Sequence, residues 1–361
     1  MSRPYNFGAG PAMFAQEVLE QAQRELLNWR NTGMSVMEIS HHSAESKALI
    51  AELQQDLREL LAIPSNYQIL LCSMPARAQY AFLPMNVLAQ GESADYVETG
   101  IWSKKAYIEA KRYADVHSVA SSESDGFMSI PHPSQWQINP QARYLHYCDN
   151  ETITGVEFAQ VPDVDGTVHL ACDMTSNFLS RPIDVKHYAV IYAGAQKNVA
   201  PAALTMVIIR DDFLTTTGAL TPEVGNYQAM AEANSLVYTP NLFACYIASL
   251  TCKWIKRMGG IDAIAERNQI QAQRVYDLID NSDFYFNPVA PIYRSRMNIT
   301  FRLARPELES TFLSEADKAG LLQLKGHRFV GGMRASLYNS MPNEGVDALC
   351  QFMHQFEKQF C

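Results

Sequence analysis

The sequence has few of the features that mark secreted, membrane-bound or metal-binding proteins. Its 361 residues include seven cysteines and no Cys-x-x-Cys pair, so neither a disulfide framework nor a zinc site is indicated. No segment approaches the ~20 apolar residues of a membrane-spanning helix, and residues 1–7 lack the apolar stretch of a signal peptide. We therefore expect a protein of the reducing cytoplasm, without a metal site and without a membrane partner.

Positive charge is also scarce. The chain has 29 Lys and Arg against 38 Asp and Glu, a net charge of −9, and its acidic residues are dispersed. Nucleic-acid binding needs clustered positive charge, so we expect no nucleic-acid partner. Small anionic ligands need only a local cluster of cations, and the overall balance does not exclude them.

Short apolar runs alternate with amphipathic segments along most of the chain. Strands are predicted at residues 67–71, 94–97, 144–147, 168–172, 190–193 and 205–209. Helices are predicted at residues 18–29, 50–60, 82–88, 104–113 and 241–258. Strands separated by helices indicate an α/β fold, with a mostly parallel sheet and helices on both of its faces.

In the C-terminal part, the regular alternation of strands and helices gives way to a mixed pattern of both. This mixed pattern predicts a smaller α+β domain. A helical pattern at 261–279 is followed by a short strand at 297–301, and a last helix buries residues 346–356 on one face. We place the boundary near residue 256. The large domain then comprises residues 15–256, and the small domain comprises residues 257–361 together with 1–14.

The stretch Val190–Asn198 ends an apolar run in small residues and a single lysine. A buried strand that stops there would present Lys197 at its carboxyl end, where open α/β sheets bind ligands. Burial lowers the pKa of a lysine, and its amine can then form a Schiff base with a carbonyl compound such as pyridoxal phosphate (PLP). Taken alone, the stretch favours the alternative, a lysine in a solvated loop.

Asp173 and Trp102 are candidate partners of such a cofactor. Asp173 follows an apolar strand, where a carboxylate needs a partner, and PLP enzymes place an Asp against the pyridine nitrogen. The alternative is an Asp that caps the next helix. Trp102 could stack on a flat cofactor, or it could cover a helix end.

Cationic residues occur in two clusters that could bind an anionic substrate. They are His41-His42 and Lys325-Gly326-His327-Arg328, the second followed by Arg334. Arginine suits carboxylates and phosphates because its guanidinium group is bidentate. Isolated charged residues usually lie on the surface, and that alternative stays open for each of them.

Several longer motifs carry a resemblance to a known family. They are Asn6–Met13, Thr32–His41, His146–Thr152, Leu179–Val185, Tyr192–Asn198 and Lys325–Ser336. In this order and spacing, nearly end to end, the chain resembles the phosphoserine aminotransferase family, which are class-V aminotransferases of PLP fold type I. The resemblance implies a mostly parallel seven-stranded sheet in a large domain and a smaller α+β C-terminal domain.

The resemblance also implies an activity. The amino group of L-glutamate would pass through PLP to 3-phosphohydroxypyruvate, giving O-phospho-L-serine and 2-oxoglutarate in serine biosynthesis. The partners would be small amino and keto acids, used in turn at one site with ping-pong kinetics.

The resemblance assigns roles to individual residues. Lys197 would hold PLP and act as the general base, Asp173 would face the pyridine nitrogen, and Trp102 would stack on the ring. The other implied cofactor contacts are Ala76, Arg77, Thr152 and Gln196, with Tyr238 and Thr239 reaching over from the second subunit of a homodimer with shared active sites. The implied substrate contacts are His41, His42, His327, Arg328 and Arg334.

The chain departs from the family at positions that recognise anions. His42 replaces an arginine, Tyr238 replaces an asparagine, and Pro75 and Ala76 stand in a loop that is usually rich in glycine. Ala9, Ala200 and Ala203 replace other small residues. Two alternatives follow: a related PLP transaminase with a different, unphosphorylated keto acid, or a PLP-fold protein that binds without turnover. Retention of Asp173 and Lys197 argues against the second.

Overall fold

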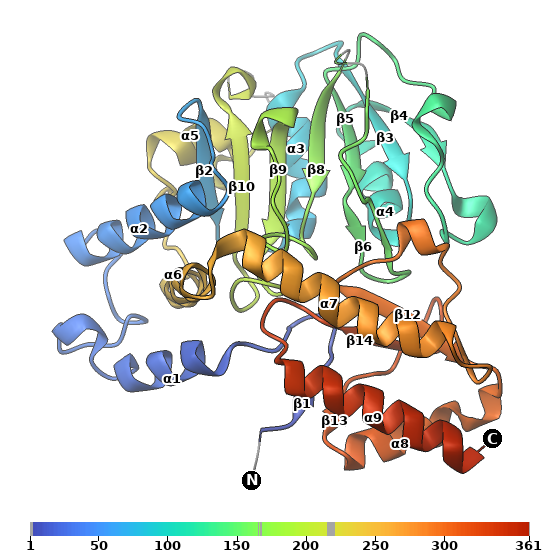
Figure 1. The fold of residues 1–361 in the computed structure, drawn as a ribbon. Coiled ribbons are helices and arrows are strands. Elements are labelled where there is room, and N and C mark those ends of the chain that lie inside the picture. Colours follow the sequence, from blue (N-terminus) through green and yellow to red (C-terminus); the bar gives the residue numbers. More distant parts are fainter. Residues whose placement is uncertain (1–2, 165, 167, 215–220, 361) are drawn as a thin grey trace.

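The computed structural model describes residues 3–164, 166, 168–214 and 221–360. At its centre lies a seven-stranded sheet with the strand order β2-β10-β9-β8-β5-β3-β4 (Figure 1). Its strands are β2 (Tyr67–Cys72), β3 (Ser93–Glu98), β4 (Asp115–Ser121), β5 (Tyr144–Cys148), β8 (His169–Asp173), β9 (Tyr188–Gly194) and β10 (Thr205–Arg210). Only the two pairings of β10 are antiparallel, which confirms the predicted α/β class and mostly parallel sheet.

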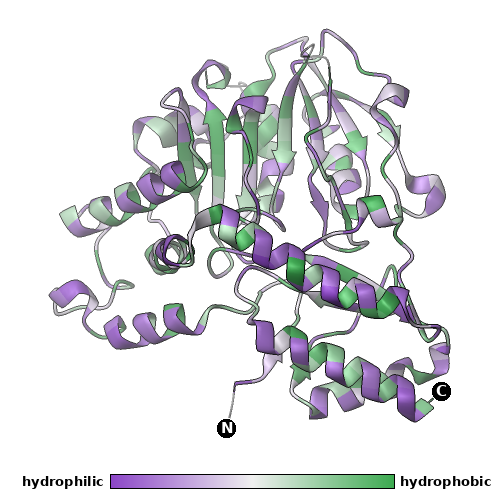
Figure 2. Cartoon of the chain, in the orientation of Figure 1, coloured by the Kyte–Doolittle hydropathy of each residue, from purple (hydrophilic) through white to green (hydrophobic). Residues whose placement is uncertain are grey.

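Helices cover both faces of this sheet because alternate residues of each strand point to opposite sides. On β2, Ile69 and Leu71 join a core with α2 (Ala44–Leu60) and α6 (Leu242–Arg257). Leu70 and Cys72 join a second core with α3 (Gln79–Val87), α4 (Ile101–Ala110) and α5 (Tyr227–Glu232). Figure 2 shows the central strands in the green of hydrophobic residues, as expected for a sheet buried on both faces.

The C-terminal part forms a separate layer below the sheet in Figure 1. Its antiparallel strands are β11 (Tyr285–Phe286), β12 (Asn298–Leu303) and β14 (Met333–Ser336). Its helices are α7 (Gly260–Asp280), α8 (Glu309–Lys318) and α9 (Asn343–Phe360). No helix within the described ranges is long and apolar enough to cross a bilayer.

The N-terminal residues pack with this C-terminal part. Strand β1 (Tyr5–Asn6) pairs in parallel with β13 (Leu321–Leu322). Phe7 is buried in the same core as residues of β12, α8 and α9. The described N-terminal residues therefore pack with the C-terminal part, and the division of the chain into two domains near residue 256 stays a prediction.

Two sequence predictions were wrong in detail. The helix predicted over 18–29 is α1 (Gln16–Glu25), and Leu26 is 37% exposed. Asn28, at φ −147° and ψ 77°, lies outside helical geometry, and Trp29 is buried from a short 3-10 turn instead. The edge strand β4 was missed because its pattern is largely exposed and polar.

Candidate active site

A cavity of about 260 Å³ lies at the carboxyl ends of the parallel strands. The ends of β5 and β8, the turn after β9, the loop before α3 and the start of α4 all contribute to its wall. Predicted cofactor residues that line it are Ala76, Arg77, Trp102, Thr152, Asp173, Gln196 and Lys197. The site therefore lies where open α/β sheets bind ligands.

Lys197 enters the cavity from the turn that follows β9. Its amine donates a hydrogen bond to the carbonyl oxygen of Ala9. Burial, together with the charge of Arg334, lowers the pKa of Lys197 to about 7, and the charge of Asp173 opposes both effects. The solvated-loop alternative is wrong, and this amine is largely neutral, hence nucleophilic, slightly above neutral pH.

Asp173 is the last residue of β8 and is only 4% exposed. Its Oδ1 accepts a hydrogen bond of 2.9 Å from the backbone N–H of Thr175, and the hydroxyl of Tyr80 lies 3.5 Å from Oδ2. A turn, not a helix, follows, so the helix-cap alternative is wrong. Burial raises the pKa of Asp173, and no cation among the described residues forms an ion pair with it.

Glu151 fixes the position of Trp102 in the first turn of α4. Its carboxylate accepts hydrogen bonds from the backbone N–H of Trp102 at 3.0 Å and of Ser103 at 2.8 Å. A Cβ on Gly100 would lie 2.1 Å from Cδ of Glu151, so only glycine fits there. Burial raises the pKa of Glu151 to about 7. Trp102 thus lies at a helix start and lines the cavity, so both interpretations of this residue apply.

The loop before α3 forms a short 3-10 turn, Ala76–Ala78. Ala76 has no positive φ, so an alanine in place of a glycine of the family's loop is not strained here. Pro75 precedes the turn at φ −69°, where a missing N–H is tolerated. Among the described residues, the backbone N–H groups of Ala76 and Arg77 have no partner, and such groups at the start of a helical turn suit a phosphate.

These features fit PLP. A buried carboxylate without an ion pair matches a protonated pyridine nitrogen. A lysine of lowered pKa matches the aldehyde, and the N–H groups of Ala76 and Arg77 match the phosphate. An aromatic side chain, Trp102, borders the space between them.

Arg334 on β14 lies beside this cavity, close enough for its charge to lower the pKa of Lys197. Its Nη1 donates a hydrogen bond of 3.2 Å to the backbone carbonyl of Thr152. His327 and Arg328 lie in the loop before β14. Burial lowers the pKa of His327, and the charges of Arg334 and Arg328 lower it further. These three predicted substrate residues are therefore close enough for their charges to interact.

The structure does not bring four other predicted residues to this cavity. His41 and His42 precede α2, with ring centroids 3.9 Å apart, and neither of them lines the cavity. The hydroxyl of Tyr238 accepts a hydrogen bond of 3.2 Å from the N–H of Ser73 in its own chain. Thr239 is exposed.

A hydrogen-bonded chain not expected from the sequence supports Lys197 from the small domain. Asn298 Nδ2 donates to the hydroxyl of Tyr338 at 3.1 Å, and that hydroxyl donates to the carbonyl of Ala9 at 2.9 Å. Ala9 thus accepts from both Tyr338 and Lys197. No sequence pattern marks Asn298 or Tyr338, since they reach the site only through tertiary packing.

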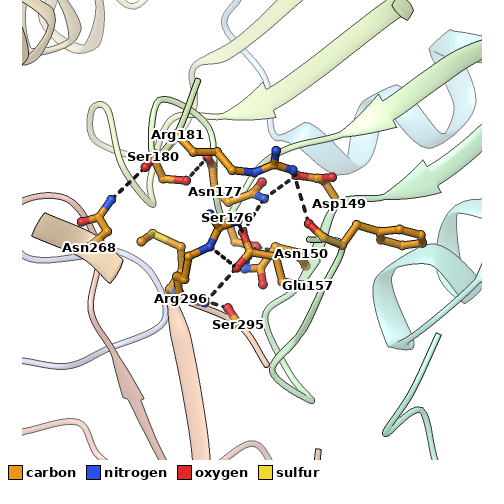
Figure 3. Close-up of polar contacts among 12 residues, drawn as sticks. Asp149, Asn150, Glu157, Ser176, Asn177, Ser180, Arg181, Asn268, Ser295 and Arg296 are labelled. Atoms are coloured by element: carbon orange, nitrogen blue, oxygen red, sulfur yellow. Dashed lines mark hydrogen bonds and ion pairs between the residues drawn. The ribbon is translucent and has the colours of Figure 1, made fainter. Parts of the chain in front are cut away.

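Behind the cavity, buried polar residues hold its wall in place (Figure 3). Asn150 Nδ2 donates to Ser176 Oγ at 2.7 Å, and both residues line the cavity. Arg181 pairs with Asp149 at 2.7 Å, and Arg296 pairs with Glu157 at 2.8 Å. Asn150 lies inside a motif that the sequence did single out, whereas Ser176 could be found only as a polar residue soon after a strand.

Comparisons with known proteins agree with this site. The aminotransferase class-V family model matches residues 4–349. The chain is 51% identical to the phosphoserine aminotransferase of Nitrosomonas europaea, over 99% of both chains, and 50% identical to that of Legionella pneumophila, again over 99% of both.

Solved structures of phosphoserine aminotransferases are similar to this chain over nearly its whole length. Phosphoserine aminotransferase from Bacillus circulans subsp. alkalophilus has a TM-score of 0.96 and 44% identity, covering 99% of each chain. PLP-bound phosphoserine aminotransferase from Trichomonas vaginalis has a TM-score of 0.94 and 40% identity, covering 98% of this chain and 100% of that one.

Proposed function

Since this chain belongs to the phosphoserine aminotransferase family of class-V aminotransferases, we propose that it transfers the amino group of L-glutamate to 3-phosphohydroxypyruvate. The products are O-phospho-L-serine and 2-oxoglutarate, and the reaction serves serine biosynthesis. The cofactor is PLP and the fold is PLP fold type I, in line with the relatives of known structure.

The main support for the proposal in this structure is that Lys197 and Asp173 line the same cavity. Lys197, with its pKa lowered to about 7, and the buried Asp173 line one cavity together with Trp102. A lysine nucleophile and a carboxylate without an ion pair are the two groups that PLP chemistry requires. Lys197 follows β9, and Asp173 is the last residue of the neighbouring strand β8.

PLP, when bound, acts as an electron sink for the electrons released at the substrate Cα. Asp173 would keep the ring nitrogen protonated, and Trp102 would hold the ring plane. Lys197, once its amine is released, would take the proton from Cα and return it at the next carbon of the cofactor. Ala9 orients this amine through its carbonyl oxygen. Arg334, beside Lys197, would bind the substrate carboxylate.

The same proposal includes a homodimer with shared active sites. His41, His42 and Thr239 do not line the cavity of their own chain, so their family roles require a second subunit. The test is complementation: a Lys197→Ala chain and a His41→Ala, Thr239→Ala chain are each inactive as homodimers. Mixed after unfolding and refolding, they should regain up to about a quarter of the activity if sites are shared. No recovery in a mixture that forms dimers would contradict the sharing.

A cytoplasmic location also belongs to the proposal. All six cysteines in the described ranges are free thiols, which fits a reducing compartment.

The deciding experiment is an acceptor panel. Purified enzyme with glutamate is offered 3-phosphohydroxypyruvate, hydroxypyruvate, pyruvate and oxaloacetate, and kcat/KM is measured for each. We expect the phosphorylated acid to be preferred by at least tenfold. Preference for an unphosphorylated acid would favour the related transaminase instead. Visible absorption that Lys197→Ala abolishes, without turnover of any acid, would favour a binding protein.

A further inference from the structure

Lys105 is a cation beside the cavity that no sequence motif singled out. It lies on α4, one turn after Trp102, and its Nζ is 4.9 Å from the centroid of the Trp102 ring. The same Nζ is 5.9 Å from the centroid of the Phe329 ring, which belongs to the loop before β14. The ammonium group therefore lies where the large domain meets the loop that carries His327 and Arg328.

The surroundings of Lys105 are strongly positive. Cζ of Arg328 lies 5.1 Å from the Phe329 ring that Lys105 also faces. Burial lowers the pKa of Lys105, and the charges of Arg77 and Arg328 lower it further, with Glu151 as the opposing charge. Glu151 already accepts hydrogen bonds from the first turn of α4, and Lys105 forms no ion pair with any described residue.

A surface lysine normally keeps its charge in water or pairs with a carboxylate. Its neighbour Lys104 does so by pairing with Glu123. Lys105 instead is half-buried and held by two aromatic rings, with two arginines near it. Such an arrangement is unfavourable until an anion joins it, and a phosphate monoester, with up to two negative charges, suits it better than a single carboxylate.

We propose that Lys105 binds the phosphate group of the amino acceptor, together with Arg77 and Arg328. The inference rests on the proposed function, because it gives the substrate of that site a further contact.

The test compares two neighbouring lysines in the PLP-loaded enzyme. Lys105→Gln should raise KM for 3-phosphohydroxypyruvate about tenfold, equivalent to about 1.4 kcal/mol, with kcat and the KM for glutamate nearly unchanged. Lys104→Gln, which removes the same charge one residue away, should change neither KM. Lys105→Arg should keep most of the affinity. An equal rise of both KM values in Lys105→Gln, or no rise in either, would overturn the proposal.

A second measurement separates this inference from the proposed function. Inorganic phosphate is titrated into the PLP-loaded enzyme by calorimetry, where the cofactor already fills its own phosphate site. Binding that weakens about tenfold in Lys105→Gln and not in Lys104→Gln supports the inference, even if 3-phosphohydroxypyruvate is not turned over. Binding that is equal in both variants contradicts it, even if the proposed reaction is confirmed.

Discussion

The amine of Lys197 and the hydroxyl of Tyr338 donate hydrogen bonds to the same acceptor, the carbonyl oxygen of Ala9. Lys197 follows the central sheet, and Tyr338 follows β14 in the small domain. The lysine amine is thereby oriented by the N-terminal segment and by the small domain together. This shared acceptor predicts that a residue outside the cavity lining influences the rate of proton transfer.

Tyr338→Phe should lower kcat about fivefold to tenfold with little change in either KM. Loss of one hydrogen bond costs about 1 kcal/mol, and here it loosens the orientation of the Lys197 amine. Tyr276→Phe is the matched control, because Tyr276 is also buried and donates to the carbonyl of Ser295 at 2.8 Å. Both variants should lose similar free energy of unfolding in urea. A kcat loss of the same size in Tyr276→Phe would mean that the effect is one of stability alone.

The pKa of Lys197 predicts how the cofactor-free protein takes up PLP. Only the neutral amine attacks an aldehyde, and burial lowers its pKa to about 7. The rate of PLP attachment, followed by its visible absorption, should therefore rise with pH and be half-maximal near pH 7. An exposed lysine would give a midpoint near its ordinary value of about 10.4, and a midpoint there would contradict the described environment.

His42→Arg should tighten the binding of the phosphorylated acceptor. Arginine offers a charged, bidentate donor where a neutral imidazole offers at most one ordinary hydrogen bond. Hydrogen bonds to charged groups contribute about 1.5–3 kcal/mol, so KM for 3-phosphohydroxypyruvate should fall by about tenfold or more. His42 is exposed, hence the melting temperature should not change. His42→Gln serves as the control and should give no gain, and an unchanged KM in His42→Arg would refute the role of this position.

Ala203→Gly should stabilise the protein by about 0.5–1 kcal/mol. Ala203 is exposed and has a φ of 68°, which strains an L-residue and is free of cost for glycine. Ala200→Gly is the control: Ala200 is 1% exposed and has no positive φ, so glycine there should destabilise by a similar amount. Urea denaturation of both variants measures the difference. A loss of stability in Ala203→Gly would contradict the strain argument.

The carboxyl ends of the strands were the part of the site that sequence predicted best. Asp173 and Lys197 each follow an apolar run, and the parallel pairing of β8 with β9 brings them to one edge of the sheet. The local sequence pattern is enough to predict that these two side chains meet, because neighbouring parallel strands end at the same edge of the sheet.

Contacts between distant segments could not be predicted in this way. Tyr338 and Ala9 are 329 residues apart in sequence, and the carboxylate that anchors Trp102 lies 49 residues away, at Glu151. Neither pair leaves a periodic pattern in the chain. The end of α1 was misplaced for a different reason: the helix stops at Glu25 and the backbone of Asn28 is not helical, although the apolar pattern continues to Trp29.

The pairing of β1 with β13 has a consequence for biosynthesis. Tyr5 leaves the ribosome early, but its partner Leu321 is made near the end of translation. The carbonyl of Ala9 belongs to the segment that this pairing anchors, and it is the acceptor for Lys197. The amine of Lys197 is therefore oriented only once almost the whole chain has been synthesised, so a nascent or truncated chain that ends before β13 lacks the pairing that anchors its acceptor.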